Sequence, residues 1–212
     1  MMKLFILGAT GPTGQCLVTQ ALDAGHEVTA VVRNPDKMTT THDKLKVVTG
    51  DIFSESSLQE QMSGQDAVLS CLGSHDGWMA EVTLYTESIK SIVGAMRAAN
   101  VTRVICLTAW CTTDEKGTFM IDWIMKPLFL KKILKNMGTM EEYLIGCEDI
   151  NYTVVKPPGL GSGNVTEKEI KTEFGQYVNG GAQRIIRADV ARFMISCLNT
   201  DTWEKKLVSI AY

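Results

Sequence analysis

Residues 8–14, Gly-Ala-Thr-Gly-Pro-Thr-Gly, form a glycine-rich loop between an apolar run and a segment with helical spacing. In loops of this type Gly8 permits a sharp turn, Gly11 lets the backbone approach a diphosphate, and Gly14 lets the following helix pack closely. The free amides at the start of that helix then bind the anion. The sequence therefore predicts a dinucleotide-binding loop, with a ligand-free glycine turn as the alternative. The residues assigned to this contact are Gly8, Thr10, Gly11, Pro12, Thr13 and Gly14.

Two basic residues follow the second predicted strand and indicate which dinucleotide binds. A site that prefers NAD would carry an acid here to hold the ribose 2′-hydroxyl. This chain carries Arg33 instead, and a guanidinium pairs well with the 2′-phosphate of NADP. Lys37 adds a second positive charge, although Asp36 could reach a ribose and Arg33 could be an ordinary solvated side chain. The sequence therefore predicts NADPH as the cofactor.

The alternation of apolar and helical segments indicates how these residues are positioned. The predicted strands are residues 3–7, 27–32, 46–48, 66–72, 103–107, 152–155, 184–187 and 207–210. The predicted helices are residues 12–24, 54–62, 81–99 and 189–198, with Ser54 and Asp189 as N-caps. This order predicts an α/β fold, a single Rossmann-like domain over residues 1–212 with a doubly wound, mostly parallel sheet.

Two less regular stretches, residues 110–137 and 159–182, predict a small substrate-side region. The first is apolar and aromatic, which suits either a lid over a pocket or a pair of core helices. The second is glycine-rich and then charged, and we expect it to be a surface excursion near the pocket mouth.

Composition and charge exclude several classes of protein. The chain has 212 residues and a net charge of −3, which argues against a nucleic-acid-binding surface. No apolar run approaches the ~18 residues needed to span a membrane. The apolar start ends at Gly8, too early for a signal peptide, so we expect a cytoplasmic location. The six cysteines never form Cys-x-x-Cys, so we expect neither a metal site nor a disulfide framework. Nothing in the composition demands an assembly, and we expect a monomer.

Several motifs occur together in the order of one known family. They are the glycine loop, Arg33, Gly50-Asp51, Leu72-Gly73 and Pro157-Pro158. This set resembles the atypical, NAD(P)-binding short-chain dehydrogenase-like proteins, and within them the branch of biliverdin reductase B and the NADPH flavin reductases. The resemblance covers nearly the whole chain. It implies hydride transfer from NADPH to a small-molecule acceptor, either a flavin or a biliverdin-type tetrapyrrole (bilin).

The resemblance also implies roles for residues at other strand ends. Asp51 and Ile52 would border the adenine, Leu72 and Gly73 would line the cofactor channel, and Thr108 would approach the nicotinamide as a catalytic residue. Besides the glycine loop, Arg33 and Lys37, the cofactor-binding residues would be Asp51, Ile52, Leu72, Gly73, Thr108 and Pro157.

The chain departs from its relatives where they handle protons. Gly159 stands where the flavin and biliverdin reductases have a histidine, and neither Tyr85 nor Tyr143 is followed by a lysine four residues later. Without an activated tyrosine we do not expect reduction of a simple ketone. A conjugated acceptor delocalises the incoming charge, so its proton can come from solvent or from a nearby side chain. His75 is the candidate for this proton donor, and the alternative is that His75 is an exposed loop residue without a role.

Aromatic and basic side chains are candidates for contacting the acceptor. Trp78, Trp110 and Trp123 could stack on a planar ring, or could be ordinary core residues. Lys156 and Arg187 could attract propionates or a phosphate, or be salt-bridged. Two other functions stay open: a non-catalytic NADP(H)-binding redox sensor, and a reductase of another small conjugated metabolite.

Overall fold

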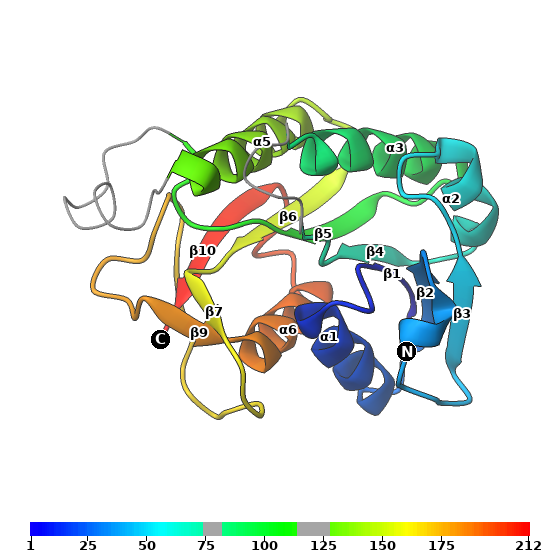
Figure 1. The fold of residues 1–212 in the computed structure, drawn as a ribbon, viewed down its shortest axis with the longest axis horizontal. Helices are drawn as coiled ribbons and strands as arrows, with labels where there is room; N and C mark the ends of the chain where they lie inside the picture. Colours follow the sequence, from blue (N-terminus) through cyan, green and yellow to red (C-terminus); the bar gives the residue numbers. More distant parts are fainter. Residues whose placement is uncertain (74–81, 114–127) are drawn as a thin grey trace.

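The computed structural model describes residues 1–73, 82–113 and 128–212, and its centre is an eight-stranded sheet (Figure 1). Across the sheet the strands are β3 (Leu45–Thr49), β2 (Glu27–Val32), β1 (Lys3–Leu7), β4 (Ala67–Ser70), β5 (Arg103–Leu107), β6 (Asn151–Lys156), β10 (Lys206–Ala211) and β8 (Lys171–Glu173). The first seven run parallel, and β8 is antiparallel to β10. This mostly parallel sheet confirms the predicted α/β, Rossmann-like fold.

Helices cover both faces of the sheet, so its parallel strands are buried on both sides. One face carries α1 (Pro12–Asp23) and α6 (Arg187–Ser196), and the other carries α2 (Glu55–Met62), α3 (Leu84–Ala98) and α5 (Leu128–Ile145) (Figure 1). On β1, Leu4 and Ile6 pack on the α1 side, whereas Phe5 and Leu7 pack on the other. Because successive side chains on a strand alternate between faces, a doubly covered strand must be apolar throughout. Within the described residues, no helix has the length and apolar character that crossing a membrane requires.

The register of the strands brings five strand ends to one edge of the sheet. Leu7 of β1 pairs with Val31 of β2 and with Ser70 of β4. Across β5 and β6, Leu107 pairs with Val155. The residues that follow these strands therefore lie along the carboxyl edge, on both sides of the point between β1 and β4 where the strand order reverses. Ligands of open α/β sheets bind at this place.

Most predicted elements are present, with differences at ends and in short strands. The helix predicted over residues 81–99 begins only at Leu84, and the strand predicted over residues 66–72 is β4, Ala67–Ser70. The predicted surface excursion contains two unpredicted strands, β8 and β7 (Gly159–Gly161); β7 pairs in parallel with β9 (Arg184–Ile186). Three-residue strands carry too little sequence pattern to be recognised. A lid or a pair of core helices was expected over residues 110–137. Of these, residues 114–127 lie outside the described residues, and residues 128–137 belong to α5.

The prediction that Asp189 is an N-cap is wrong, because Ile186 caps α6 and Asp189 lies in its first turn. Asp189 is fully buried. Its carboxylate accepts hydrogen bonds from the Thr166 amide (2.8 Å), from the Thr166 hydroxyl (2.7 Å) and from the Tyr212 hydroxyl. Burial alone would raise the pKa of this carboxyl, but these hydrogen bonds outweigh it and the pKa is lowered. The carboxylate thus connects α6 to the loop after β7 and to the end of the chain.

We expect Asp189→Ala to lower the free energy of unfolding by about 2–4 kcal/mol, because buried donors would lose their acceptor. Since the pKa of Asp189 is lowered on folding, its contribution is present above the usual carboxyl pKa and is lost as the pH falls below it. Urea unfolding at neutral and acid pH therefore should show a difference that shrinks in acid. Asp149→Ala, which removes a half-exposed partner of Arg97, is the matched control with a much smaller effect. Equal losses in the two variants would contradict this role for Asp189.

Candidate functional site

Two glycines of the loop after β1 are required by the fold itself. Gly8 has φ of +76°, and a Cβ there would lie 2.6 Å from the backbone carbonyl of Cys71. A Cβ on Gly14 would lie 2.1 Å from the carbonyl oxygen of Gly8, so α1 can approach the loop only with glycine at this position. Burial raises the pKa of the neighbouring Cys71 thiol to about 12, so this side chain stays neutral beside any bound anion. The loop is therefore tightly packed against the end of β4.

The third glycine, Gly11, is less tightly constrained by the fold than Gly8 and Gly14, since a Cβ there would require its neighbour to shift by only a few tenths of an ångström. Its φ is −75°, and the nearest atom to a Cβ there would be the Gly8 carbonyl oxygen at 3.3 Å. Gly11 is the N-cap of α1, no side chain caps this helix, and Pro12 comes first in it. The amides of Thr13 and Gly14 in the first turn therefore lack intrahelical acceptors. Bare backbone at position 11 and open amides beside it fit a diphosphate.

The expected adenosine side of the site lies at the ends of β2 and β3. Arg33 comes two residues after Val31, the β2 partner of Leu7, so it lies at the same edge as the loop. Arg33 and Lys37 are exposed, and neither makes an ion pair or a side-chain hydrogen bond within the described part of the chain. After β3, the exposed Asp51 accepts a hydrogen bond from the Phe53 amide (2.9 Å), and Ile52 is buried. The two basic side chains are thus free to meet a phosphate.

The expected nicotinamide side is formed by the ends of β4, β5 and β6. Leu72 and Gly73 follow β4, with Leu72 half-buried and Gly73 exposed. Thr108 follows β5, and its amide donates to the Val155 carbonyl (3.0 Å). Pro157 follows β6 and is buried; its carbonyl accepts from the Trp110 amide (3.0 Å). These contacts hold the β5 and β6 ends together, so the structure brings the predicted residues to one edge.

A buried ion pair lies beneath Thr108. Lys156, at the end of β6, is fully buried, and its Nζ is 3.0 Å from Glu141 Oε2 of α5. Glu141 also accepts hydrogen bonds from Thr108 Oγ1 and from Thr112 Oγ1, both at 2.7 Å. Lys156 is therefore salt-bridged inside the protein, and the alternative that it attracts propionates is wrong in this structure. Arg187 is half-buried, with its Nη1 3.3 Å from Ser162 Oγ.

Of the three tryptophans predicted to contact the acceptor, only Trp110 lies in the described residues. It is 7% exposed, and its ring meets that of Tyr177 edge to face at a centroid distance of 6.4 Å. Little of the Trp110 side chain is exposed to a planar acceptor, so stacking on Trp110 stays a prediction. Trp78, Trp123 and His75 lie outside the described residues.

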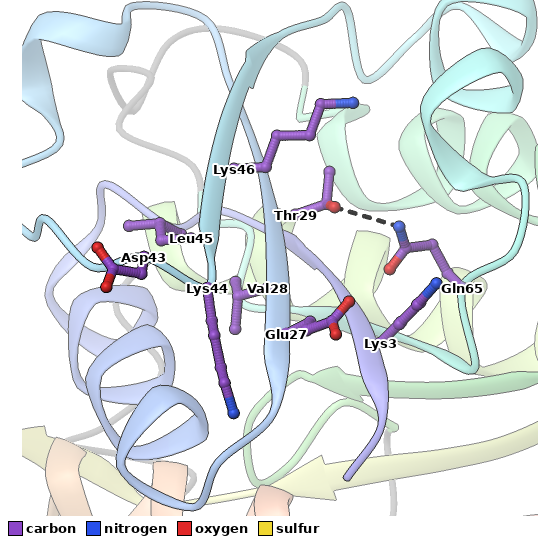
Figure 2. A pocket seen from close by; sticks show the side chains of 9 residues that line it. All are labelled: Lys3, Glu27, Val28, Thr29, Asp43, Lys44, Leu45, Lys46 and Gln65. Carbon is purple, nitrogen blue, oxygen red and sulfur yellow. Dashed lines mark hydrogen bonds between the residues drawn. The ribbon is translucent and has the colours of Figure 1, made fainter.

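A hollow of about 300 Å³ opens at the opposite edge of the sheet (Figure 2). It is lined by Lys3, Glu27, Val28, Thr29, Asp43, Lys44, Leu45, Lys46 and Gln65. These residues lie at or near the starts of β1 to β4, away from the glycine loop. Its polar groups bond locally: Gln65 Nε2 donates to Thr29 Oγ1 (3.1 Å), and Lys46 Nζ donates to Gln61 Oε1 (3.0 Å). This hollow is therefore not the dinucleotide site.

Comparison with known proteins agrees with the geometry of the loop edge. The sequence model of a family described as NAD(P)H-binding matches residues 8–201. The chain belongs to the NAD(P)H-binding family. Among its relatives, the uncharacterised protein YwnB of Bacillus subtilis is 27% identical over 162 residues, which cover 74% of this chain and 71% of YwnB.

Solved structures of similar fold cover the whole chain. A proposed epimerase of Bacteroides thetaiotaomicron is 26% identical with a TM-score of 0.84, and the match covers 100% of this chain and 97% of that one. A proposed NADH-flavin reductase of Streptococcus pneumoniae is 22% identical with a TM-score of 0.81, covering 100% and 99%. These structures support the Rossmann-like fold of this NAD(P)H-binding family member.

The sequence analysis did not identify Glu141, whose carboxylate accepts the hydrogen bond of the Thr108 hydroxyl. Glu141 shares one face of α5 with the buried Met137, Met140 and Leu144. A carboxylate on an apolar helical face must find a partner, and Lys156 at the end of the apolar strand β6 has the opposite charge. The signal in the sequence was thus a pair of charges at positions where the spacing demands apolar residues.

Proposed function

We propose that this protein is an NADPH-dependent reductase whose acceptor is a flavin or a biliverdin-type tetrapyrrole. The observation that carries the proposal is the row of ligand-ready groups along one sheet edge. Arg33, which has no side-chain partner among residues 1–73, 82–113 and 128–212, is at one end. The open amides of the glycine loop are in the middle, and Thr108 is at the other end. When bound, NADPH supplies a hydride from C4 of its nicotinamide, while the protein provides binding and orientation.

The preference for a conjugated acceptor follows from the side chains near Thr108. A simple ketone needs a proton donor at its oxygen. Thr108 Oγ1 donates its proton to Glu141 (2.7 Å), and Tyr143 of α5 interacts with Arg97 of α3 and with Cys147. Tyr152 and Lys156 have the Tyr-x-x-x-Lys spacing, but both lie on strand β6, where four residues separate their side chains by about 13 Å along the strand. Burial raises the pKa of the Tyr143 hydroxyl, which further weakens it as an acid. A flavin or bilin delocalises the added electrons, and water can supply the single proton that balances the hydride.

The choice of NADPH is supported by Arg33, since its exposed guanidinium is free to form a charge-assisted fork with a 2′-phosphate. The choice of acceptor is supported by the shared fold of the proposed flavin reductase from Streptococcus pneumoniae. We place the acceptor beside the irregular region that includes β7 and β8. The acceptor would be the small-molecule partner of the protein. We propose that the enzyme itself is a monomer and that it is cytoplasmic.

The test is consumption of NADPH, followed by its ultraviolet absorbance, with FMN, riboflavin and biliverdin as separate acceptors. We expect turnover with at least one of them and none in their absence. Binding of NADPH without turnover with any flavin or bilin would contradict the reductase. That result would favour the second candidate, a non-catalytic NADP(H)-binding sensor, which agrees with a Thr108 hydroxyl whose proton is already donated to Glu141.

A further inference from the structure

Five side chains near the end of β5 form one hydrogen-bonded cluster. They are Thr108, Thr112, Glu141, Lys156 and Gln176. Thr108 is 4%, Glu141 2% and Lys156 0% exposed, so water is excluded from the ion pair at its centre. In such a pair each charge offsets the burial of the other, so we take Glu141 as a carboxylate and Lys156 as an ammonium.

The donors and acceptors of this cluster can be assigned by counting. The ammonium of Lys156 has three protons and three acceptors: Thr112 Oγ1 at 2.7 Å, Glu141 Oε2 at 3.0 Å and Gln176 Oε1 at 3.2 Å. Thr112 Oγ1 accepts from Lys156, and of the two acceptors within reach of its own proton, Glu141 Oε2 (2.7 Å) is nearer than Gln176 Oε1 (3.3 Å). The Glu141 carboxylate has no proton to give.

The same count fixes the hydroxyl of Thr108. Thr108 Oγ1 lies 2.7 Å from Glu141 Oε1 and must donate to it. A hydroxyl has a single proton, so only the lone pairs of Thr108 Oγ1 remain for a ligand. The bond to a charged, buried acceptor also polarises the hydroxyl and strengthens those lone pairs as acceptors.

We propose that Glu141 and Lys156 are positioning residues that fix Thr108 Oγ1 as a hydrogen-bond acceptor for the carboxamide N–H of the nicotinamide ring. The inference rests on the proposed function, because it requires the nicotinamide half to extend from the glycine loop past β4 to β5 and to reach Thr108, a residue that is 4% exposed. With Arg33 holding the adenosine half beyond β2, the opposite half lies toward β5. In this role Thr108 recognises the cofactor and gives no proton to the acceptor.

Binding of a cofactor analogue tests this inference without any acceptor. In nicotinic acid adenine dinucleotide phosphate a carboxylate replaces the carboxamide, so its lone pairs would face those of Thr108. We expect calorimetry to show that the protein binds NADP⁺ at least about tenfold more tightly than this analogue, the effect of one lost charge-assisted hydrogen bond. Thr108→Ser keeps the hydroxyl and should keep this ratio, whereas Thr108→Val should lower it at least about threefold.

A double variant tests the positioning residues themselves. Glu141→Leu/Lys156→Met removes both buried charges together, a change that folds tolerate far better than removal of one. It frees the Thr108 proton, which can then donate to the carboxylate of the analogue, so we expect the ratio to fall at least as far as in Thr108→Val. Adding Thr108→Val to the double variant should then lower the ratio no further, because both changes act through one hydroxyl. Met137→Leu, on the same buried face of α5, is the control that should leave the ratio unchanged.

Each remaining outcome counts against the inference in a distinct way. Equal binding of the two nucleotides by the unchanged protein would overturn it while leaving the proposed function intact. A double variant that loses thermal stability but keeps the ratio would show that Glu141 and Lys156 are only structural, which also overturns it. Failure of the unchanged protein to bind either nucleotide would overturn the proposed function together with this inference.

Discussion

Gly11→Asp is expected to lower the affinity for NADPH at least about 100-fold with little change in folding stability. Position 11 is the N-cap of α1, with extended backbone (φ −75°, ψ 161°) that aspartate adopts readily. The new carboxylate would cap the same amides that we assign to the diphosphate, and its charge would repel the ligand. Because the capping by aspartate offsets the close contact of its Cβ with the Gly8 carbonyl oxygen (3.3 Å), the free energy of unfolding should change by less than about 1 kcal/mol.

Two other glycine variants separate this effect from general damage. Gly14→Ala places a methyl group 2.1 Å from the Gly8 carbonyl oxygen, so we expect it to lose both binding and stability. Gly146→Asp adds the same charge at an exposed turn after α5 and should change neither property much. Calorimetric titration with NADPH and urea unfolding measure the two quantities. If Gly11→Asp bound NADPH within about threefold of the unchanged protein, the loop would not hold the diphosphate.

The fold could be predicted because its main signals are local. The apolar runs of β1 and β2, the helical spacing of α1 and the glycines between them all lie within the first 32 residues. The half of the site that uses backbone amides was therefore visible in the sequence. At Gly11 a Cβ would meet only the Gly8 carbonyl oxygen, at 3.3 Å, so the fold constrains this position less than Gly8 and Gly14, and a bound diphosphate is our proposed reason for its glycine.

The parts that could not be predicted depend on contacts between distant residues. Asp189 follows a short polar pattern typical of an N-cap, but its partners Thr166 and Tyr212 each lie 23 residues away. Glu141 and Lys156 are 15 residues apart on different elements, and only the packing of α5 against the sheet brings them together. The pairing of β8 with β10 is equally non-local. A sequence shows that a buried charge needs a partner, whereas the tertiary structure decides which partner it finds.

Arg33→Glu is expected to raise the dissociation constant for NADPH about 100-fold and that for NADH by less than about threefold. A charge-assisted fork to the 2′-phosphate contributes about 1.5–3 kcal/mol, and the glutamate adds repulsion; NADH lacks this phosphate. Lys46→Glu makes the same change of charge in the hollow at the opposite edge of the sheet and is the matched control. The loss for NADPH should also shrink at high salt, since both groups are exposed. Equal losses for the two cofactors would mean that Arg33 attracts the shared diphosphate through long-range charge, and the preference for NADPH would then need another source.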